Sequence, residues 1–247
     1  MDSDKTTSWC YNMHMIYSDL ELAQLHVATL FVHDSRGGLL RVNEPDPDAP
    51  VPRFFLARTR AGNLWRTRYD LPDYLAAELE RLATGEPVGG DLDTPPYHVA
   101  EYTALLQQHA PLHNTDAGPA YSLPERDPPT GTVTITPANE TLLQVHYSYT
   151  LSRRAERAPV VVHVADEVAV AVCFSARITA QAAEAGVHTV EIYRGHGYAA
   201  DTVLGWAAAI RAMGRLPLYS TSWANTASQA VARKLGAVQY AGTFSVT

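Results

Sequence analysis

The residues best suited to chemistry lie in a glycine-rich turn near the C-terminal end of the chain. A β-prone segment at residues 188–192 leads into Arg194-Gly195-His196-Gly197, and an alanine-rich helical segment begins at Ala199. Because glycine has no Cβ, the backbone of this turn can adopt open dihedral angles and direct its N–H groups outward. A helix that starts there adds unpaired N–H groups and the positive end of its dipole. The pattern predicts a site for phosphate oxygens.

The second half of the chain supplies the elements that must position this turn. Apolar or alternating segments predict strands at residues 132–136, 159–164, 168–177, 182–190, 216–222 and 238–246. Helices are predicted at about 137–153, 199–213 and 225–235, with Asn225 as the N-cap of the last. The turn is therefore expected between the strand at 182–190 and the helix at 199–213.

The first half of the chain has its own set of predicted elements. Ser18 and Glu21 fit a capping box, so a helix is expected near 19–30, followed by hairpins at 31–43 and 54–69. Two further helices are predicted at about 70–85 and 97–109. Residues 111–131 are rich in proline, which is typical of a linker. We therefore predict an N-terminal α+β domain over 1–118, a linker over 119–130 and a second domain over 131–247.

Charge and composition restrict the partners that can be expected. The 247 residues carry a net charge of −7, which argues against a general nucleic-acid binder because no basic excess is available to neutralise a phosphate backbone. After Asp201 the chain has no acidic residue but four basic ones, Arg211, Arg215, Arg233 and Lys234. These residues either extend the anion site or are scattered solvated charges.

Cysteine content and hydropathy bear on metal binding and on the cellular location of the protein. Cys10 and Cys173 are too few for a disulfide framework or a metal site, so no metal is expected, and Cys173 fits a small core residue. No signal peptide is visible, and no apolar run approaches the roughly 18 residues needed to span a bilayer. We expect a cytoplasmic protein without a membrane partner.

Two familiar phosphate-binding motifs fit the turn poorly. The chain contains no G-x-x-x-x-G-K-[ST] sequence, which excludes a P-loop. Gly195, Gly197 and Ala200 satisfy G-x-G-x-x-A, but a dinucleotide site also needs a carboxylate about twenty residues further on. The next predicted strand ends near Ser220, in a region without any acidic residue. A nicotinamide-dependent oxidoreductase is therefore a minor alternative.

Three sequence blocks, in order, resemble the GNAT N-acyltransferase superfamily. Residues 194–199 match its [RQ]-x-x-G-x-[GA] pyrophosphate loop, and residues 186–189 match the end of its central strand. Residues 219–228 with Lys234-Leu235-Gly236 match its late strand and helix. The resemblance covers about residues 131–247 and implies an α/β (α+β) fold, with a mixed, mainly antiparallel sheet flanked by helices. Residues 1–118 show no related motif.

The resemblance also implies a co-substrate, acetyl-CoA, with its pyrophosphate on the loop and its pantetheine arm along the preceding strand. Arg194 could instead brace the turn or form a surface ion pair, and Asn225 and Ser228 also fit ordinary roles at a helix start. The implied coenzyme-binding residues are Val187, His188, Thr189, Arg194, Gly195, His196, Gly197, Tyr198, Ala199, Asn225 and Ser228.

Acyl transfer to an amine needs a proton acceptor, since an alkyl amine is mostly protonated at neutral pH. The resemblance places a general base at Glu184, which could equally be a carboxylate on the strand surface. Thr189 is the candidate for a backbone N–H that polarises the thioester oxygen. Where many members carry a tyrosine that protonates the leaving thiolate, this chain has Ala232; His188 and Tyr219 are the candidate substitutes.

The leading hypothesis is an N-acetyltransferase that acts on a small-molecule or peptide amine by direct attack on the thioester. The alternative is a non-catalytic coenzyme A-binding sensor or regulatory module, suggested by Ala232 and by the unmatched first half. That half is expected to cover the acceptor side or to form a subunit contact, as in a homodimer.

Overall fold

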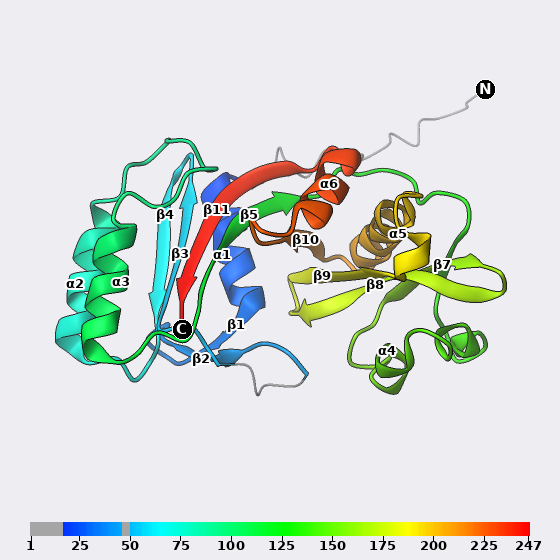
Figure 1. Ribbon diagram of the computed structural model, residues 1–247, viewed down its shortest axis with the longest axis horizontal. Helices are drawn as coiled ribbons and strands as arrows, with labels where there is room; N and C mark the ends of the chain where they lie inside the picture. Colours follow the sequence, from blue (N-terminus) through cyan, green and yellow to red (C-terminus); the bar gives the residue numbers. More distant parts are fainter. Residues whose placement is uncertain (1–16, 46–49) are drawn as a thin grey trace, which may run out of the picture.

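A nine-stranded sheet organises the computed structural model of the chain, which describes residues 17–45 and 50–247 (Figure 1). Its strands are β3 (Phe54–Thr59), β4 (Gly62–Thr67), β5 (Thr115–Ser122), β6 (Thr132–Thr134), β7 (Val160–Ala165), β8 (Val168–Ile178), β9 (Ala182–Thr189), β10 (Leu216–Ser220) and β11 (Val238–Val246). The spatial order is β4-β3-β11-β5-β10-β9-β8-β7-β6. Every neighbouring pair in this order is antiparallel except β9 and β10, which are parallel.

A small second sheet and a set of helices complete the described chain. The small sheet pairs β1 (Phe31–His33) with β2 (Leu39–Val42). The helices are α1 (Asp19–Leu30), α2 (Asp73–Thr84), α3 (Val99–His109), α4 (Ser148–Ser152), α5 (Tyr198–Ala212) and α6 (Thr226–Leu235), with short 3₁₀ helices η2 (Glu140–Leu143) and η3 (Glu191–Tyr193). The mixed, mainly antiparallel sheet flanked by helices confirms the predicted fold class.

The helices divide between the two faces of the sheet, as the alternating side-chain directions along β9 show. Ala182 packs in one cluster with α1, whereas Ala183 packs in another with Trp206 of α5. Successive side chains of a strand point to opposite faces, so α1 and α5 cover opposite faces. The η2–α4 segment packs on Val172, which pairs with His188 of β9, and therefore shares the α1 face. Figure 1 shows α5 and α4 on opposite sides of β8 and β9.

The predicted linker at residues 119–130 needs a correction. Residues 119–122 are the second half of β5, which lies between β10 and β11 in the middle of the sheet. Pro119, one of the prolines that suggested a linker, lies within this strand, and its neighbour Gly118 has to be glycine because a Cβ there would lie 1.8 Å from the carbonyl oxygen of Thr221. The sheet is continuous across the predicted boundary, and the division into two domains stays a prediction.

The helix predicted at 137–153 is also wrong, since this segment forms only the short η2 and α4. The Asn139 side chain accepts a hydrogen bond from the Thr136 N–H at 2.7 Å and donates one to the Thr134 carbonyl at 3.1 Å. Such local bonds offer the backbone an alternative to a continuous helix. The other predicted helices and hairpins are present, with ends shifted by a few residues.

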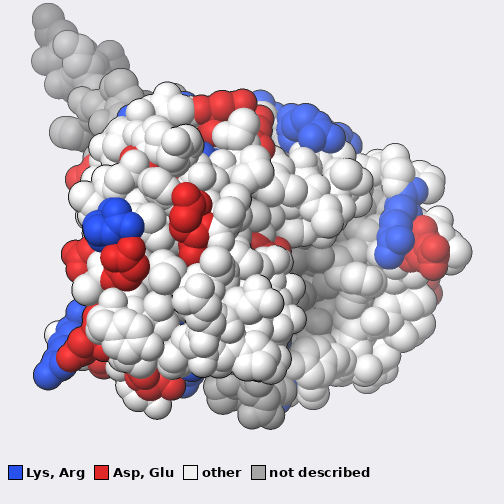
Figure 2. All heavy atoms as spheres, turned by 60° about the vertical axis from the view of Figure 1, so that its left-hand side comes forward, with Lys and Arg blue, Asp and Glu red and all other residues white. Residues whose placement is uncertain are grey.

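The other predictions from the sequence concern the distribution of charge, the role of the cysteines, metal binding and membrane-spanning segments. In the face shown in Figure 2, acidic and basic side chains lie in small mixed groups, and the surface is hollowed between a larger body and the lobe at the right. Cys173 is a buried core residue, as predicted, while Cys10 lies outside the described residues. Within residues 17–45 and 50–247, no helix is long and apolar enough to cross a membrane, and no group of three His, Cys, Asp or Glu residues could hold a metal ion.

Candidate active site

The two parallel strands β9 and β10 pair only over their first residues. The paired positions are Leu216 with Ala182, Pro217 with Ala183 and Leu218 with Glu184. Beyond Leu218 and Glu184 no further pair joins them, and β9 continues to Thr189. The sheet is therefore split at the carboxyl ends of two parallel strands, the place where open α/β sheets characteristically bind ligands.

The edge of β9 offers hydrogen-bond donors to this split. The N–H of Val190 donates to the carbonyl of Val170 on β8 at 2.9 Å. In an antiparallel ladder the direction of the N–H groups alternates along the strand. The N–H groups of Val187 and Thr189 therefore point away from β8, into the split.

The glycine-rich turn closes one end of the split. Gly195 and Gly197 have φ of +84° and +92°, in the region that favours glycine. Gly197 is the N-cap residue of α5, and no side chain caps that helix. A Cβ at position 197 would lie 2.0 Å from the Nζ of Lys234, so the ammonium group of α6 lies directly over the turn. The uncapped helix start and this positive charge both favour a bound anion.

His196 braces the turn from outside. Its Nδ1 lies 3.0 Å from the carbonyl oxygen of Arg194 and 3.2 Å from that of Tyr193. Its ring also stacks on Tyr198, which in turn stacks on His163 of β7 with ring centroids 3.8 Å apart. The sequence showed no sign of this three-ring stack, because His163 is distant along the chain.

The split and the turn together form a cleft of about 580 Å³. All the predicted coenzyme-binding residues line it except His196, which folds back onto its own turn. Their role in binding stays a prediction, but the structure brings them together around one cavity. The lining consists of Val187, His188, Thr189, Tyr193, Arg194, Gly195, Gly197, Tyr198, Ala199, Ala200, Asn225, Ala227, Ser228, Ala230, Val231 and Lys234.

The start of α6 forms the opposite wall of the cleft. Asn225 Oδ1 accepts a hydrogen bond from the Ser228 N–H at 3.0 Å, which confirms Asn225 as the N-cap. The Ser228 hydroxyl lies 2.7 Å from the hydroxyl of Tyr219, a pair that the sequence analysis missed. Burial raises the pKa of Tyr219 to about 12. Ala232, on the same helix, is buried in the core and is not part of the cleft lining.

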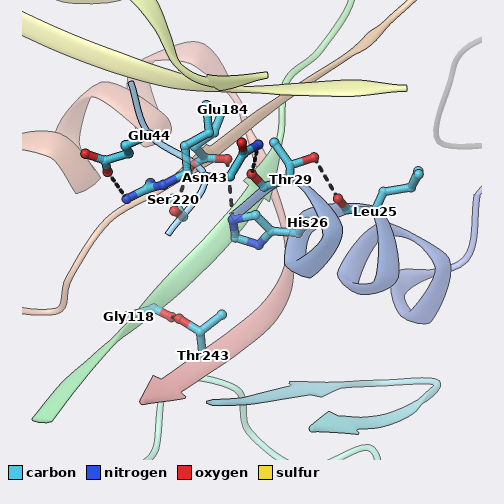
Figure 3. A network of polar contacts seen from close by, with 10 residues as sticks. Leu25, His26, Thr29, Asn43, Glu44, Gly118, Glu184, Ser220 and Thr243 are labelled. Carbon is cyan, nitrogen blue, oxygen red and sulfur yellow. Dashed lines mark hydrogen bonds and ion pairs between the residues drawn. The ribbon is translucent and has the colours of Figure 1, made fainter. Parts of the chain in front are cut away.

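Glu184 lies at the base of the split and is 2% exposed, which excludes the alternative of a surface carboxylate. The Ser220 hydroxyl donates to its Oε1 at 2.6 Å, and the Nε2 of His26 lies 3.4 Å from its Oε2 (Figure 3). At 3.4 Å the His26 contact is longer than a charge-assisted hydrogen bond. Burial alone would raise the pKa of Glu184, but His26, Ser220 and Arg177 together lower it below its usual value. The carboxylate is therefore ionised at neutral pH.

Glu184 faces the α1 side of the sheet, and its partner comes from the first half of the chain. His26 is itself buried, at 1% exposed, and belongs to α1 (Figure 3). Arg177 of β8 pairs in addition with Glu44. Residues outside the segment that carries the family resemblance thus complete the surroundings of the predicted base.

No protein-family model and no curated protein matches the chain. Solved structures similar to it include a GCN5-related N-acetyltransferase-like protein from Streptococcus suis, 15% identical with a TM-score of 0.46, over 83% of this chain and 87% of that one. A GNAT-family acetyltransferase from Colwellia psychrerythraea is 13% identical with a TM-score of 0.46, over 94% and 98% of the two chains.

A GNAT-family structure from Novosphingobium aromaticivorans is 18% identical with a TM-score of 0.43. That match spans 55% of this chain and 65% of the Novosphingobium chain, less than two thirds of its length. These neighbours carry the family name that the sequence resemblance suggested. With identities and TM-scores this low, any functional proposal has to rest on the residues of this chain.

Proposed function

We propose that the chain binds acetyl-CoA in the split between β9 and β10 and transfers the acetyl group to an amine. The observation that carries the proposal is the split itself, which opens beyond Leu218 and Glu184 into the cleft of about 580 Å³. One edge of the cleft offers backbone donors, and one end offers an uncapped helix start beneath Lys234. A long ligand with an anionic end and a polar, strand-like arm fits this arrangement.

The residues present fit coenzyme A in two respects. The turn of Gly195 and Gly197 leaves room for the pyrophosphate, where Lys234 adds a positive charge. The free N–H groups of Val187 and Thr189 can pair with the amides of the pantetheine arm, as a strand edge pairs with an added extended peptide. Acetyl-CoA, when bound, supplies an acetyl group activated as a thioester.

The backbone donor for the thioester oxygen is better placed at Val187 than at Thr189, the residue favoured by the sequence. A strand rises about 3.3 Å per residue, so Val187 lies about 10 Å along β9 from Glu184 and Thr189 about 16 Å. Since the acceptor amine must reach both the thioester and the proton acceptor, the nearer N–H suits the reaction better. We assign Val187 to the thioester oxygen and Thr189 to the pantetheine arm.

Glu184 accepts the proton that the amine loses. Its carboxylate is ionised, the Ser220 hydroxyl orients it through Oε1, and Oε2 accepts no hydrogen bond within the described residues. The amine nitrogen forms the new amide bond while the carbon–sulfur bond breaks, and the amine proton passes to Glu184, directly or through water.

The leaving thiolate needs a proton from another group, because Ala232 has no hydroxyl. The raised pKa of Tyr219, about 12, makes this residue a poorer acid than a free tyrosine. His188 lines the cleft and is exposed, so its imidazole is the better placed donor. We assign thiolate protonation to His188.

Thiol release from acetyl-CoA in the presence of a panel of small amines and peptides tests this function. We expect release above background for at least one amine. Glu184→Gln should lower kcat about 100-fold or more while acetyl-CoA binding is kept. Glu191→Gln is the matched control, because Glu191 is exposed next to the same turn and should have no effect.

Each negative result in these assays would contradict a different part of the proposed function. Binding of acetyl-CoA without thiol release for any amine would indicate a non-catalytic coenzyme A-binding module. Equal rates for Glu184→Gln and the wild type would remove Glu184 as the proton acceptor. Absence of acetyl-CoA binding would overturn the proposal as a whole.

A further inference from the structure

Three arginines of the described chain are buried, and one of them differs from the other two. Arg53 is 3% exposed, Arg58 is 8% exposed and Arg157 is 7% exposed. Arg53 donates to the carbonyls of Leu106, Ala110, Pro111 and Thr247. Arg58 donates to those of Leu92 and Thr94. For Arg157, the described residues provide no hydrogen-bond or ion-pair partner for any guanidinium nitrogen, and its Nε is buried without one.

The guanidinium of Arg157 is held by aromatic rings instead. Its Cζ lies 4.7 Å from the ring centroid of Phe174 and 5.4 Å from that of Tyr149. Its carbonyl accepts a hydrogen bond from the Ser175 N–H at 2.9 Å, which fixes the backbone against β8. Stacking of this kind stabilises a cation and orients the plane of the guanidinium, but it leaves the N–H donors unused.

Buried charged groups are almost always paired, so an oriented guanidinium with free donors is suited to an anion from outside the chain. The planar fork of arginine matches a carboxylate through two parallel hydrogen bonds.

The position of Arg157 relates it to the site of acyl transfer. Phe174 pairs with Gly186 of β9, and a Cβ at position 186 would lie 2.5 Å from the Phe174 ring. The ring therefore covers Gly186 on the face of the sheet that also carries Glu184, two residues away or about 7 Å along the strand. Arg157 stacks on the same ring, so a carboxylate bound at Arg157 and an amine near Glu184 would both lie beside Phe174.

We propose that the amine acceptor carries a carboxylate that Arg157 binds, which makes the substrate class an amino acid or a short amino-carboxylate. This proposal rests on the function proposed above. Arg157 would bind the carboxylate, Phe174 would line the space between the two ends, and Glu184 would receive the proton of the amine.

Matched acceptors that differ only in the carboxylate test the proposal. Thiol release is measured with the standard L-amino acids and with the corresponding amino acid amides, whose carboxylate is replaced by a neutral carboxamide. We expect kcat/KM of the best amino acid to exceed that of its amide by about 10- to 100-fold. Arg157→Gln should remove this preference, chiefly by raising KM, and should leave the affinity for acetyl-CoA unchanged.

Arg153→Gln is the matched control variant. Arg153 lies over the same Tyr149 ring, with Cζ 5.6 Å from its centroid, and pairs with Glu156. This variant should keep the preference for the carboxylate. If Arg157→Gln does not fold, Arg157→Lys keeps the charge without the planar fork and should lose most of the preference. A preference that survives in a folded Arg157 variant, or equal rates for acids and amides in the wild type, would overturn the proposal.

A binding measurement separates this proposal from the failure of acyl transfer. Ligand-observed NMR with the same amino acids and amides, in the presence of coenzyme A, detects binding without turnover. Amino acid binding that is lost in Arg157→Gln would support the carboxylate site even if no thiol were released. Absence of amino acid binding, or binding unchanged by Arg157→Gln, would contradict it.

Discussion

Replacing Gly197 with alanine should weaken coenzyme binding in addition to destabilising the fold. The residue has a φ of +92°, where an L-residue is strained by about 1–2 kcal/mol. The added Cβ would lie 2.0 Å from the Nζ of Lys234, so the flexible ammonium has to leave its place over the turn. A charge-assisted contact to phosphate contributes about 1.5–3 kcal/mol. Losing it should weaken acetyl-CoA binding roughly 10- to 100-fold.

Gly214→Ala provides the matched control. Gly214 has a φ of +71° just beyond the end of α5, and a Cβ there would meet no atom within 4 Å. Both variants should lose about 1–2 kcal/mol in the free energy of unfolding, measured in urea, but calorimetric titration should show weaker acetyl-CoA binding only for Gly197→Ala. Lys234→Met should reproduce the loss of affinity without the strain. Equal acetyl-CoA affinity in the two alanine variants would refute the assignment of the turn to the pyrophosphate.

Four further predictions concern the surroundings of the cleft. His26→Ala should lower the free energy of unfolding by about 3–5 kcal/mol, because Glu184 loses a buried partner, and a urea midpoint equal to the wild type would contradict this. The pKa of Glu184 is lowered from 4.5 in the folded protein, so the ionised carboxylate stabilises the fold fully above pH 4.5 and loses this effect as the pH falls through the lowered pKa. Glu184→Gln should therefore make the free energy of unfolding less dependent on pH in this acid range. Asn225→Ala should lower the free energy of unfolding, measured in urea, by about 1 kcal/mol because the N-cap is lost. A decrease below a few tenths of a kcal/mol would exclude the cap as a stabilising contact. Gly186→Ala should displace Phe174 and raise the acceptor KM in the thiol-release assay without changing acetyl-CoA affinity; an unchanged KM would place the acceptor elsewhere.

The turn at residues 194–199 could be predicted because its determinants are local. Two glycines with positive φ, a strand before them and a helix after them all lie within a short stretch of sequence. The capping box at Ser18 and the cap at Asn225 were predictable for the same reason, since each joins residues three apart. Such signals do not depend on what the rest of the chain does.

The features that the sequence missed all depend on contacts between distant residues. Pro119 and its neighbours were interpreted as a linker, yet β5 is held in the sheet by β10 and β11, which follow much later in the chain. His26 meets Glu184 only because α1 covers the base of the split. Arg157 gains its place from Phe174 and Tyr149, and no local pattern marks a guanidinium stacked between rings.

The binding of coenzyme A in the split between β9 and β10 is tested most directly by amide hydrogen exchange, read residue by residue by NMR. On addition of acetyl-CoA, the amides of Val187, Thr189 and the turn at 195–199 should exchange more slowly, and those of α3 should not change. NADH, added in parallel, should leave all of them unchanged. Unaltered exchange of these amides with saturating acetyl-CoA, or their protection by NADH instead, would contradict the account.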